Sequence, residues 1–106
     1  MERGITVECT EISNMQLNQL LFNREKVQLI DVREIDEFRD GHLEGSQLIP
    51  LGTLPYRTYE LDPYKPVVLI CRSGNRSKEA CKILTDRGFH AVSLRGGLTN
   101  WYAHVS

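Results

Sequence analysis

The feature that most constrains the fold is a fully apolar run, Val67–Ile70, which leads directly into Cys71. The length of this run and its β-branched residues are typical of a buried strand. The segment at 75–87 that follows has apolar residues at helical spacing, and Gly88 is well placed to end that helix. The sequence therefore places a cysteine where a buried strand ends and a helix begins.

The loop between this strand and this helix reads Cys71, Arg72, Ser73, Gly74, Asn75, Arg76 and Ser77. When such a loop curls, its backbone N–H groups point into its centre, and the first turn of the helix adds partial positive charge. Such an arrangement attracts anions and favours the thiolate form of a cysteine. The guanidinium groups of Arg72 and Arg76 add donors suited to an oxyanion. One stretch thus combines a nucleophile with an anion-binding loop.

Shorter strand-like and helical patterns alternate along the rest of the chain. We expect strands at 27–32, 47–49 and 91–94, and a short edge strand near the end of 5–12. We expect helices at 14–22, 35–40 and 98–105, and one or two helical turns within 51–66. Ser13 and Gln16 have the spacing of a capping box. This alternation predicts an α/β fold with a mostly parallel sheet covered on both faces. Ligands bind such sheets beyond the carboxyl ends of the strands, where Asp31 and Cys71 are expected.

Composition restricts the class of protein. A chain of 106 residues, 41% hydrophobic and 25% charged, fits one domain with a modest core. The formal net charge of -1 argues against a nucleic-acid partner or an anionic membrane surface. Three cysteines without regular spacing are not typical of a disulfide framework, and the start of the chain lacks the apolar core of a signal peptide. No apolar run approaches the roughly 20 residues that span a bilayer. We therefore expect a soluble protein in a reducing compartment, the cytoplasm.

Several motifs occur in an order that resembles one known family. They are Leu29-Ile30-Asp31-Val32-Arg33-Glu34 with Glu37-Phe38, Gly41-His42-Leu43 with Gly45-Ser46, Ile49-Pro50-Leu51, the cysteine loop, Gly88-Phe89, and Leu94-Arg95-Gly96-Gly97 with Trp101. Together they resemble the single-domain rhodaneses, which are sulfurtransferases. The resemblance implies one rhodanese-like domain over 1–106, with its core at about 12–104, and a five-stranded mostly parallel sheet with helices on both faces. It also implies transfer of sulfane sulfur through a cysteine persulfide.

The spacing within the loop distinguishes this family from phosphatases. In cysteine-dependent phosphatases, including dual-specificity enzymes that share the rhodanese fold, the motif has five residues between the cysteine and an arginine. Here four residues separate Cys71 from Arg76, and Ser77 occupies the position after five. A ring of N–H groups that is smaller by one residue favours the terminal sulfur of thiosulfate or of a persulfide over a phosphate ester.

The resemblance implies a role for each residue of the loop. Cys71 is expected to attack the outer sulfur of the donor, and the substrate-binding residues are Arg72, Ser73, Gly74, Asn75, Arg76 and Ser77. The two arginines would orient the sulfonate of thiosulfate. Asp31 and Arg33 are supporting candidates: Asp31 either reaches the loop across the sheet or, as we favour, acts as a structural partner in its own turn. No cofactor and no metal site is predicted.

The expected partners are a small anionic sulfur donor, thiosulfate or a persulfide, and a thiol acceptor such as a sulfur-carrier or thioredoxin-like protein. Two other classes of function stay open. The domain is alternatively a non-turnover sulfur-carrier, redox-sensing or partner-binding module that uses the same loop. It is less readily an arsenate or phosphate-ester enzyme, because the loop is short. Cys81 is expected in the core, and neither it nor Cys9 is favoured as a resolving thiol for Cys71.

Overall fold

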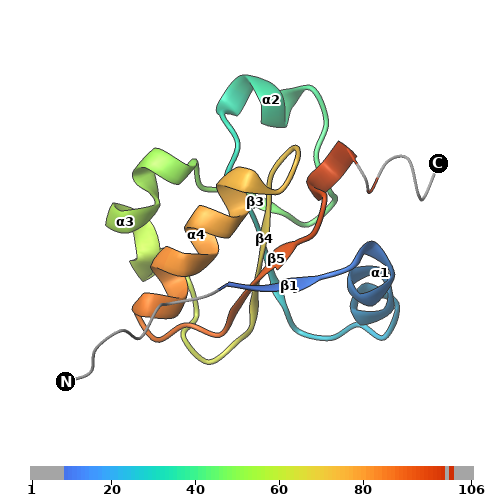
Figure 1. The fold of residues 1–106 in the computed structure, drawn as a ribbon, viewed down its shortest axis with the longest axis horizontal. Helices are drawn as coiled ribbons and strands as arrows, with labels where there is room; N and C mark the ends of the chain where they lie inside the picture. The colour runs from blue at the N-terminus through green and yellow to red at the C-terminus, as the bar shows by residue number, and fades with distance from the viewer. Residues whose placement is uncertain (1–8, 100, 102–106) are drawn as a thin grey trace.

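The computed structural model describes residues 9–99 and 101, which form a single five-stranded sheet flanked by helices (Figure 1). All the strand pairings are parallel, and the strand order is β1-β5-β4-β2-β3. The elements in chain order are β1 (Thr10–Ile12), α1 (Asn14–Phe22), β2 (Gln28–Asp31), α2 (Ile35–Arg39), β3 (Gln47–Leu48), η1 (Leu51–Thr53), α3 (Leu54–Arg57), η2 (Thr58–Glu60), β4 (Val67–Ile70), α4 (Asn75–Asp86) and β5 (Ala91–Leu94). The predicted α/β architecture is therefore confirmed.

The central strand β4 separates two hydrophobic cores. Its residues Val67 and Leu69 pack on the side of α3 and α4, whereas Val68 and Ile70 pack on the side of α1. All four side chains are buried, because a strand in the middle of a parallel sheet is covered on both faces. The two helical layers are seen on opposite sides of the sheet in Figure 1. This double coverage explains why the run at 67–70 has no polar residue.

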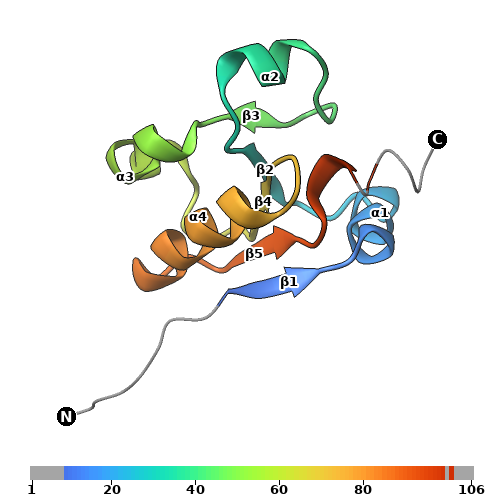
Figure 2. The ribbon, with the colours of Figure 1, turned by 45° about the horizontal axis from the view of Figure 1, so that its top comes forward.

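Strand register brings the two predicted functional ends together. Asp31, the last residue of β2, pairs with Ile70, the last residue of β4. Cys71 follows directly, and α4 begins at Asn75. Figure 2 shows the loop after β4 beside the turn that follows β5, with α2 beyond it. The carboxyl edge of the sheet thus carries the segments expected to form the site.

The local patterns in the sequence match the observed elements closely. Helix α1 covers the expected 14–22, and both hydrogen bonds of the capping box between Ser13 and Gln16 are present, at 2.7 and 3.0 Å. Strand β1 lies at an edge of the sheet, as expected. The segment at 51–60 forms two 3-10 turns around α3, where one or two helical turns were predicted. Residues 97–99 and 101 are helical, and the rest of the helix predicted at 98–105 lies outside the described residues.

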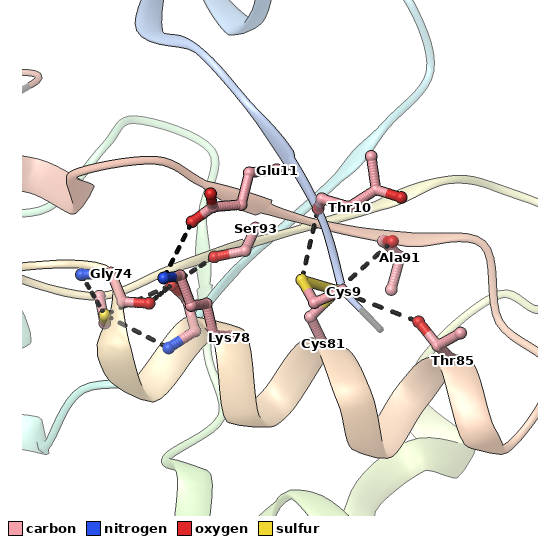
Figure 3. Close-up of a disulfide and its surroundings, with 11 residues drawn as sticks. Cys9, Thr10, Glu11, Gly74, Lys78, Cys81, Thr85, Ala91 and Ser93 are labelled. Atoms are coloured by element: carbon pink, nitrogen blue, oxygen red, sulfur yellow. Dashed lines mark hydrogen bonds and ion pairs between the residues drawn. A yellow bond between two sulfur atoms is a disulfide. The ribbon is translucent and has the colours of Figure 1, made fainter. Parts of the chain in front are cut away.

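A disulfide joins Cys9, which precedes β1, to Cys81 in α4 (Figure 3). The two Cα atoms are 5.5 Å apart although the residues are 72 positions apart in sequence. Three irregularly spaced cysteines were not expected to form a disulfide framework, and this disulfide contradicts that expectation, because cysteine number and spacing do not report the strand order. β1 lies beside β5, and α4 packs on β5, so the topology brings the two cysteines together. Cys71 is the free cysteine, and the cysteine pattern no longer argues for a reducing compartment.

We predict that breaking this disulfide lowers the free energy of unfolding by about 2–4 kcal/mol, because the bond restricts a long loop in the unfolded chain. Urea unfolding of Cys9→Ser, compared with the oxidised wild type, measures the loss. Cys9 is the better site for the change, since Cys81 is fully buried and a serine there would add a buried hydroxyl. Wild type treated with a reductant should unfold at the same urea concentration as the variant. Identical stability of the oxidised and reduced wild type would contradict this expectation.

Candidate active site

The Cys71 side chain lies at the base of the loop that links β4 to α4. Its Sγ atom accepts hydrogen bonds from the backbone N–H groups of Gly74, at 3.0 Å, and Ser77, at 3.3 Å. The residue is fully buried, whereas Ser73 and Asn75 on the loop are exposed. These amides, together with the N-terminal end of the twelve-residue helix α4, direct partial positive charge at the sulfur. The loop therefore has the form of a small anion-binding ring with a cysteine sulfur inside it.

Two buried hydroxyl groups extend this network away from solvent. Ser77 Oγ lies 3.4 Å from Cys71 Sγ and donates to the carbonyl oxygen of Gly74 at 3.0 Å. It also lies 2.6 Å from the hydroxyl oxygen of Ser93, which comes from β5. Both serines are fully buried. Ser77 was predicted to lie in the loop; Ser93 was not singled out, because nothing in its local sequence marks a serine in a strand as part of a site.

The turn after β5 holds the loop from the other side. The backbone N–H of Leu98 donates to the carbonyl of Cys71 at 2.8 Å, and that of Thr99 donates to the carbonyl of Arg72 at 3.0 Å. This close approach requires Gly97, whose φ is +61° and at which a Cβ atom would overlap both of those carbonyl oxygens. Gly97 is therefore required by the packing against the cysteine loop as well as by the turn.

We predict that Gly97→Ala displaces the loop and reduces the reactivity of Cys71 at least tenfold, since the added methyl group must push two backbone carbonyls aside. Gly45→Ala is the matched control, because Gly45 also has a positive φ, +86°, but a Cβ there meets nothing within 4 Å. The measurement is the rate at which a small thiol reagent modifies the cysteine. Equal rates in the two variants would contradict the contact between Gly97 and the loop as the reason for the glycine.

The two arginines of the loop have different surroundings. Arg76 binds Glu37 of α2 with both terminal nitrogens, at 2.7 and 2.9 Å. Arg72 approaches the same carboxylate less closely, with Nε at 3.6 Å, and its side chain is 64% exposed. The structure thus directs the fork of Arg76 to a partner within the protein and leaves Arg72 as the more accessible of the two cations.

Glu37 is the residue of this region whose role the sequence patterns did not indicate. It appeared only as part of a family motif, in a helix of five residues of which three are charged. Hydrogen bonds from the Arg76 guanidinium and, to a lesser extent, from the backbone N–H of Glu34 together lower the pKa of Glu37 from 4.5 to about 2, although burial acts in the opposite direction. Its carboxylate therefore stays ionised and holds the two cations of the loop at the rim of the site.

The depressed pKa of Glu37 makes a specific prediction for stability against pH. Because the folded-state pKa is below the unfolded value, the contribution is complete above about pH 4.5 and is lost as the pH falls from 4.5 towards 2. We expect Glu37→Gln to lower the free energy of unfolding by about 1–2 kcal/mol at neutral pH, allowing for solvent screening. Urea unfolding at several pH values measures it. A difference from wild type that stays constant down to pH 2 would contradict the ion pair as its source.

Asp31 and Arg33 form a buried ion pair at the end of β2. The guanidinium of Arg33 binds both carboxylate oxygens of Asp31, at 2.7 to 3.1 Å, and donates to the carbonyl of Gly41 at 2.7 Å. The backbone N–H of Arg33 also donates to Asp31 Oδ1. These contacts are those of the structural partner that we favoured for Asp31. His42, next along the loop, has Nδ1 2.8 Å from the carbonyl of Phe38 and stacks on that ring.

A hollow of about 370 Å³ opens beside the cysteine loop, between α2 and the turn after β5. It places a concave surface with side chains of both charges beside the exposed part of the loop. Its lining residues are Arg33, Glu37, Asp40, Gly41, Arg72, Leu98 and Thr99. Within 9–99 and 101, no three His, Cys, Asp or Glu residues gather as metal ligands do.

The sequence model of the rhodanese-like domain family matches residues 13–104. The chain belongs to the rhodanese-like domain family. It is 39% identical over 95 residues to a putative sulfurtransferase of Bacillus subtilis, and the matched region covers 90% of this chain and 92% of that protein. It is 30% identical over 96 residues to a thiosulfate sulfurtransferase of Shewanella oneidensis, covering 88% of this chain and 95% of that protein. The family implied by the motifs is thereby confirmed, and both of these relatives are named sulfurtransferases.

The fold agrees with solved structures of the same family. A rhodanese-related protein of Thermoplasma volcanium superposes with a TM-score of 0.81 and 29% identity, covering 91% of this chain and 93% of that one. Among the residues that the structure describes, no helix has the length and apolar character needed to cross a membrane.

Proposed function

We propose that this rhodanese-like domain moves sulfane sulfur from thiosulfate or a persulfide donor to a thiol or cyanide acceptor through a persulfide on Cys71. The observation that carries this proposal is the position of Cys71 Sγ, which accepts hydrogen bonds from the backbone N–H groups of Gly74 and Ser77. The loop around it has four residues between Cys71 and Arg76. The sulfurtransferase names of relatives at 30 to 39% identity support the class of reaction.

The first displacement joins the cysteine to the donor. The Cys71 thiolate attacks the outer sulfur of thiosulfate, a bond forms between Sγ and that sulfur, and the sulfur–sulfur bond of the donor breaks. Sulfite leaves with the electron pair. In the second displacement, an acceptor thiolate or cyanide attacks the outer sulfur of the persulfide, and Cys71 departs as a thiolate. No external oxidant or reductant is needed, which gives a ping-pong cycle.

The loop provides the electrostatic part of catalysis in this proposal. Ring amides that already face Sγ stabilise the negative charge of the thiolate and of the persulfide without rearrangement during the reaction. Arg72 is exposed at the rim and orients the sulfonate of the donor, while Arg76 adds charge from the position that Glu37 fixes. Since Cys71 is buried, the loop favours a donor that presents a single small sulfur atom.

The acceptor in this proposal is a thiol, carried by a small molecule or by a sulfur-carrier or thioredoxin-like protein. Arg72 and Lys78 are exposed near the loop, each with a carboxylate at 3.5 to 3.6 Å, Glu37 for Arg72 and Glu11 for Lys78. Such a surface attracts anionic thiols and acidic partner faces. Cyanide is the convenient acceptor for an assay.

We predict that incubation with thiosulfate adds the mass of one sulfur atom, and that cyanide then removes it with formation of thiocyanate. Cys71→Ser should abolish both the adduct and the thiocyanate, because the attacking atom is absent. Cys81→Ser should retain nearly full loading, because Cys81 lies in the core and is paired with Cys9. Intact-protein mass spectrometry and a colorimetric thiocyanate assay provide the two measurements.

Other outcomes separate the alternative functions. Equal loss of loading in the Cys71 and Cys81 variants, with the Cys81 variant still folded by thermal unfolding, would indicate a dithiol mechanism. Loading without any transfer to cyanide or thiols would indicate a sulfur carrier that does not turn over. If neither an adduct nor thiocyanate forms with thiosulfate or with a low-molecular-weight persulfide, the sulfurtransferase proposal fails.

A further inference from the structure

Ser93 occupies a position where the alternation of β5 calls for an apolar side chain. Ala91, two residues earlier on the same face, packs in the core under α4, whereas Leu94 packs in the core on the other side. Ser93 is fully buried. A hydroxyl group in such a place costs free energy unless it is hydrogen-bonded, and a hydrophobic residue would normally be preferred. The exception points to a purpose for the hydroxyl group.

The only described partner of the Ser93 hydroxyl, within 9–99 and 101, is Ser77 Oγ at 2.6 Å. Figure 3 shows Ser93 reaching from β5 towards the start of α4, near Gly74. Ser77 in turn contacts Cys71 Sγ at 3.4 Å. The hydrogen bonds therefore run from Ser93 on β5 through Ser77 to the sulfur of Cys71, and among the described residues none joins Ser93 directly to Cys71.

Counting protons shows what this arrangement does. Ser77 has one hydroxyl proton and three neighbours: the Gly74 carbonyl, the Ser93 hydroxyl and Cys71 Sγ. When Cys71 is a thiol, it donates its own proton to Ser77, and Ser77 donates to Gly74. When Cys71 has lost that proton to a base in solution, the Ser77 hydroxyl can turn to donate to the thiolate. Ser77 can make this bond only if the Ser93 hydroxyl donates its own proton to Ser77 Oγ, because otherwise the single proton of Ser77 is directed to Ser93.

We propose that Ser93 is a positioning residue that donates to Ser77 Oγ and so reserves the single proton of Ser77 for the thiolate or persulfide on Cys71. A donated hydrogen bond also polarises the hydroxyl group that receives it, which strengthens the bond this group makes to the sulfur. The inference deepens the proposed function, because it concerns the reactivity of the same cysteine. It assigns a role in the site to a residue of β5, which is not part of the cysteine loop.

The test follows the ionisation of Cys71 directly. With the Cys9–Cys81 disulfide intact, Cys71 is the single thiol among the three cysteines, so the ultraviolet absorbance of the thiolate against pH reports this residue alone. Cys71→Ser gives the baseline. Ser93→Ala should raise the pH of half-ionisation by about half a unit, because the hydrogen bond from Ser77 to the thiolate remains but is no longer strengthened by a donor to Ser77. Because no sulfur transfer is involved, the result is independent of the thiosulfate assay.

A double-mutant cycle tests whether the effect passes through Ser77. Ser77→Ala alone should raise the midpoint by about one unit or more, and adding Ser93→Ala to it should change nothing further. A purely structural role for Ser93 would give the same shift in both backgrounds, or none in either, and would overturn the proposal. Ser46→Ala is the control, since the Ser46 hydroxyl donates to the Leu43 carbonyl outside the loop.

A second pair of variants covers the case in which a cavity at position 93 disturbs the fold. Ser93→Thr and Ser93→Val add nearly the same volume, but only threonine keeps a hydroxyl group. The threonine variant should keep the wild-type midpoint more closely than the valine variant, with equal thermal unfolding temperatures as evidence of equal folding. If valine and threonine shift the midpoint alike, the hydroxyl of Ser93 has no positioning role.

Discussion

The structure of this site depends on the hydrogen bonds from the Gly74 and Ser77 amides to Cys71 Sγ. They exist because a buried parallel strand stops at Ile70 and a helix starts at Asn75, which leaves only a few residues to make the connection. A short connection turns its N–H groups inwards, and the helix adds its dipole in the same direction. The surrounding elements then serve to keep this small ring closed.

Two neighbouring segments, the turn after β5 and helix α2, hold the cysteine loop closed through different kinds of interaction. The turn after β5 binds the carbonyls of Cys71 and Arg72 through backbone groups, so it depends on shape and on the absence of a side chain at Gly97. Helix α2 binds Arg76 through the carboxylate of Glu37, so that contact depends on charge. One support is insensitive to pH and the other is not, which means that acid is expected to loosen the α2 side first.

Sequence reasoning reached the elements with strong periodicity and the residues that are neighbours along the chain. The strand at 67–70, the helix after it and the loop between them are local features, and the capping box of α1 is local as well. Glu37, Ser93 and the Cys9–Cys81 pair were missed as parts of the structure because each acts across the sheet or between layers. Their partners are 39, 16 and 72 residues away, and no single-sequence pattern encodes such distances.

The disulfide has a consequence for how molecules of this protein meet one another. β1 is the first strand of the chain and lies at the edge of the sheet, so it is an element that two copies of a protein can exchange. The covalent bond from Cys9 to α4 of the same chain ties that strand to its own sheet. Exchange of β1 between two copies would require a bond to break, so oxidation makes the fold self-contained, whereas reduction opens a route to swapped dimers.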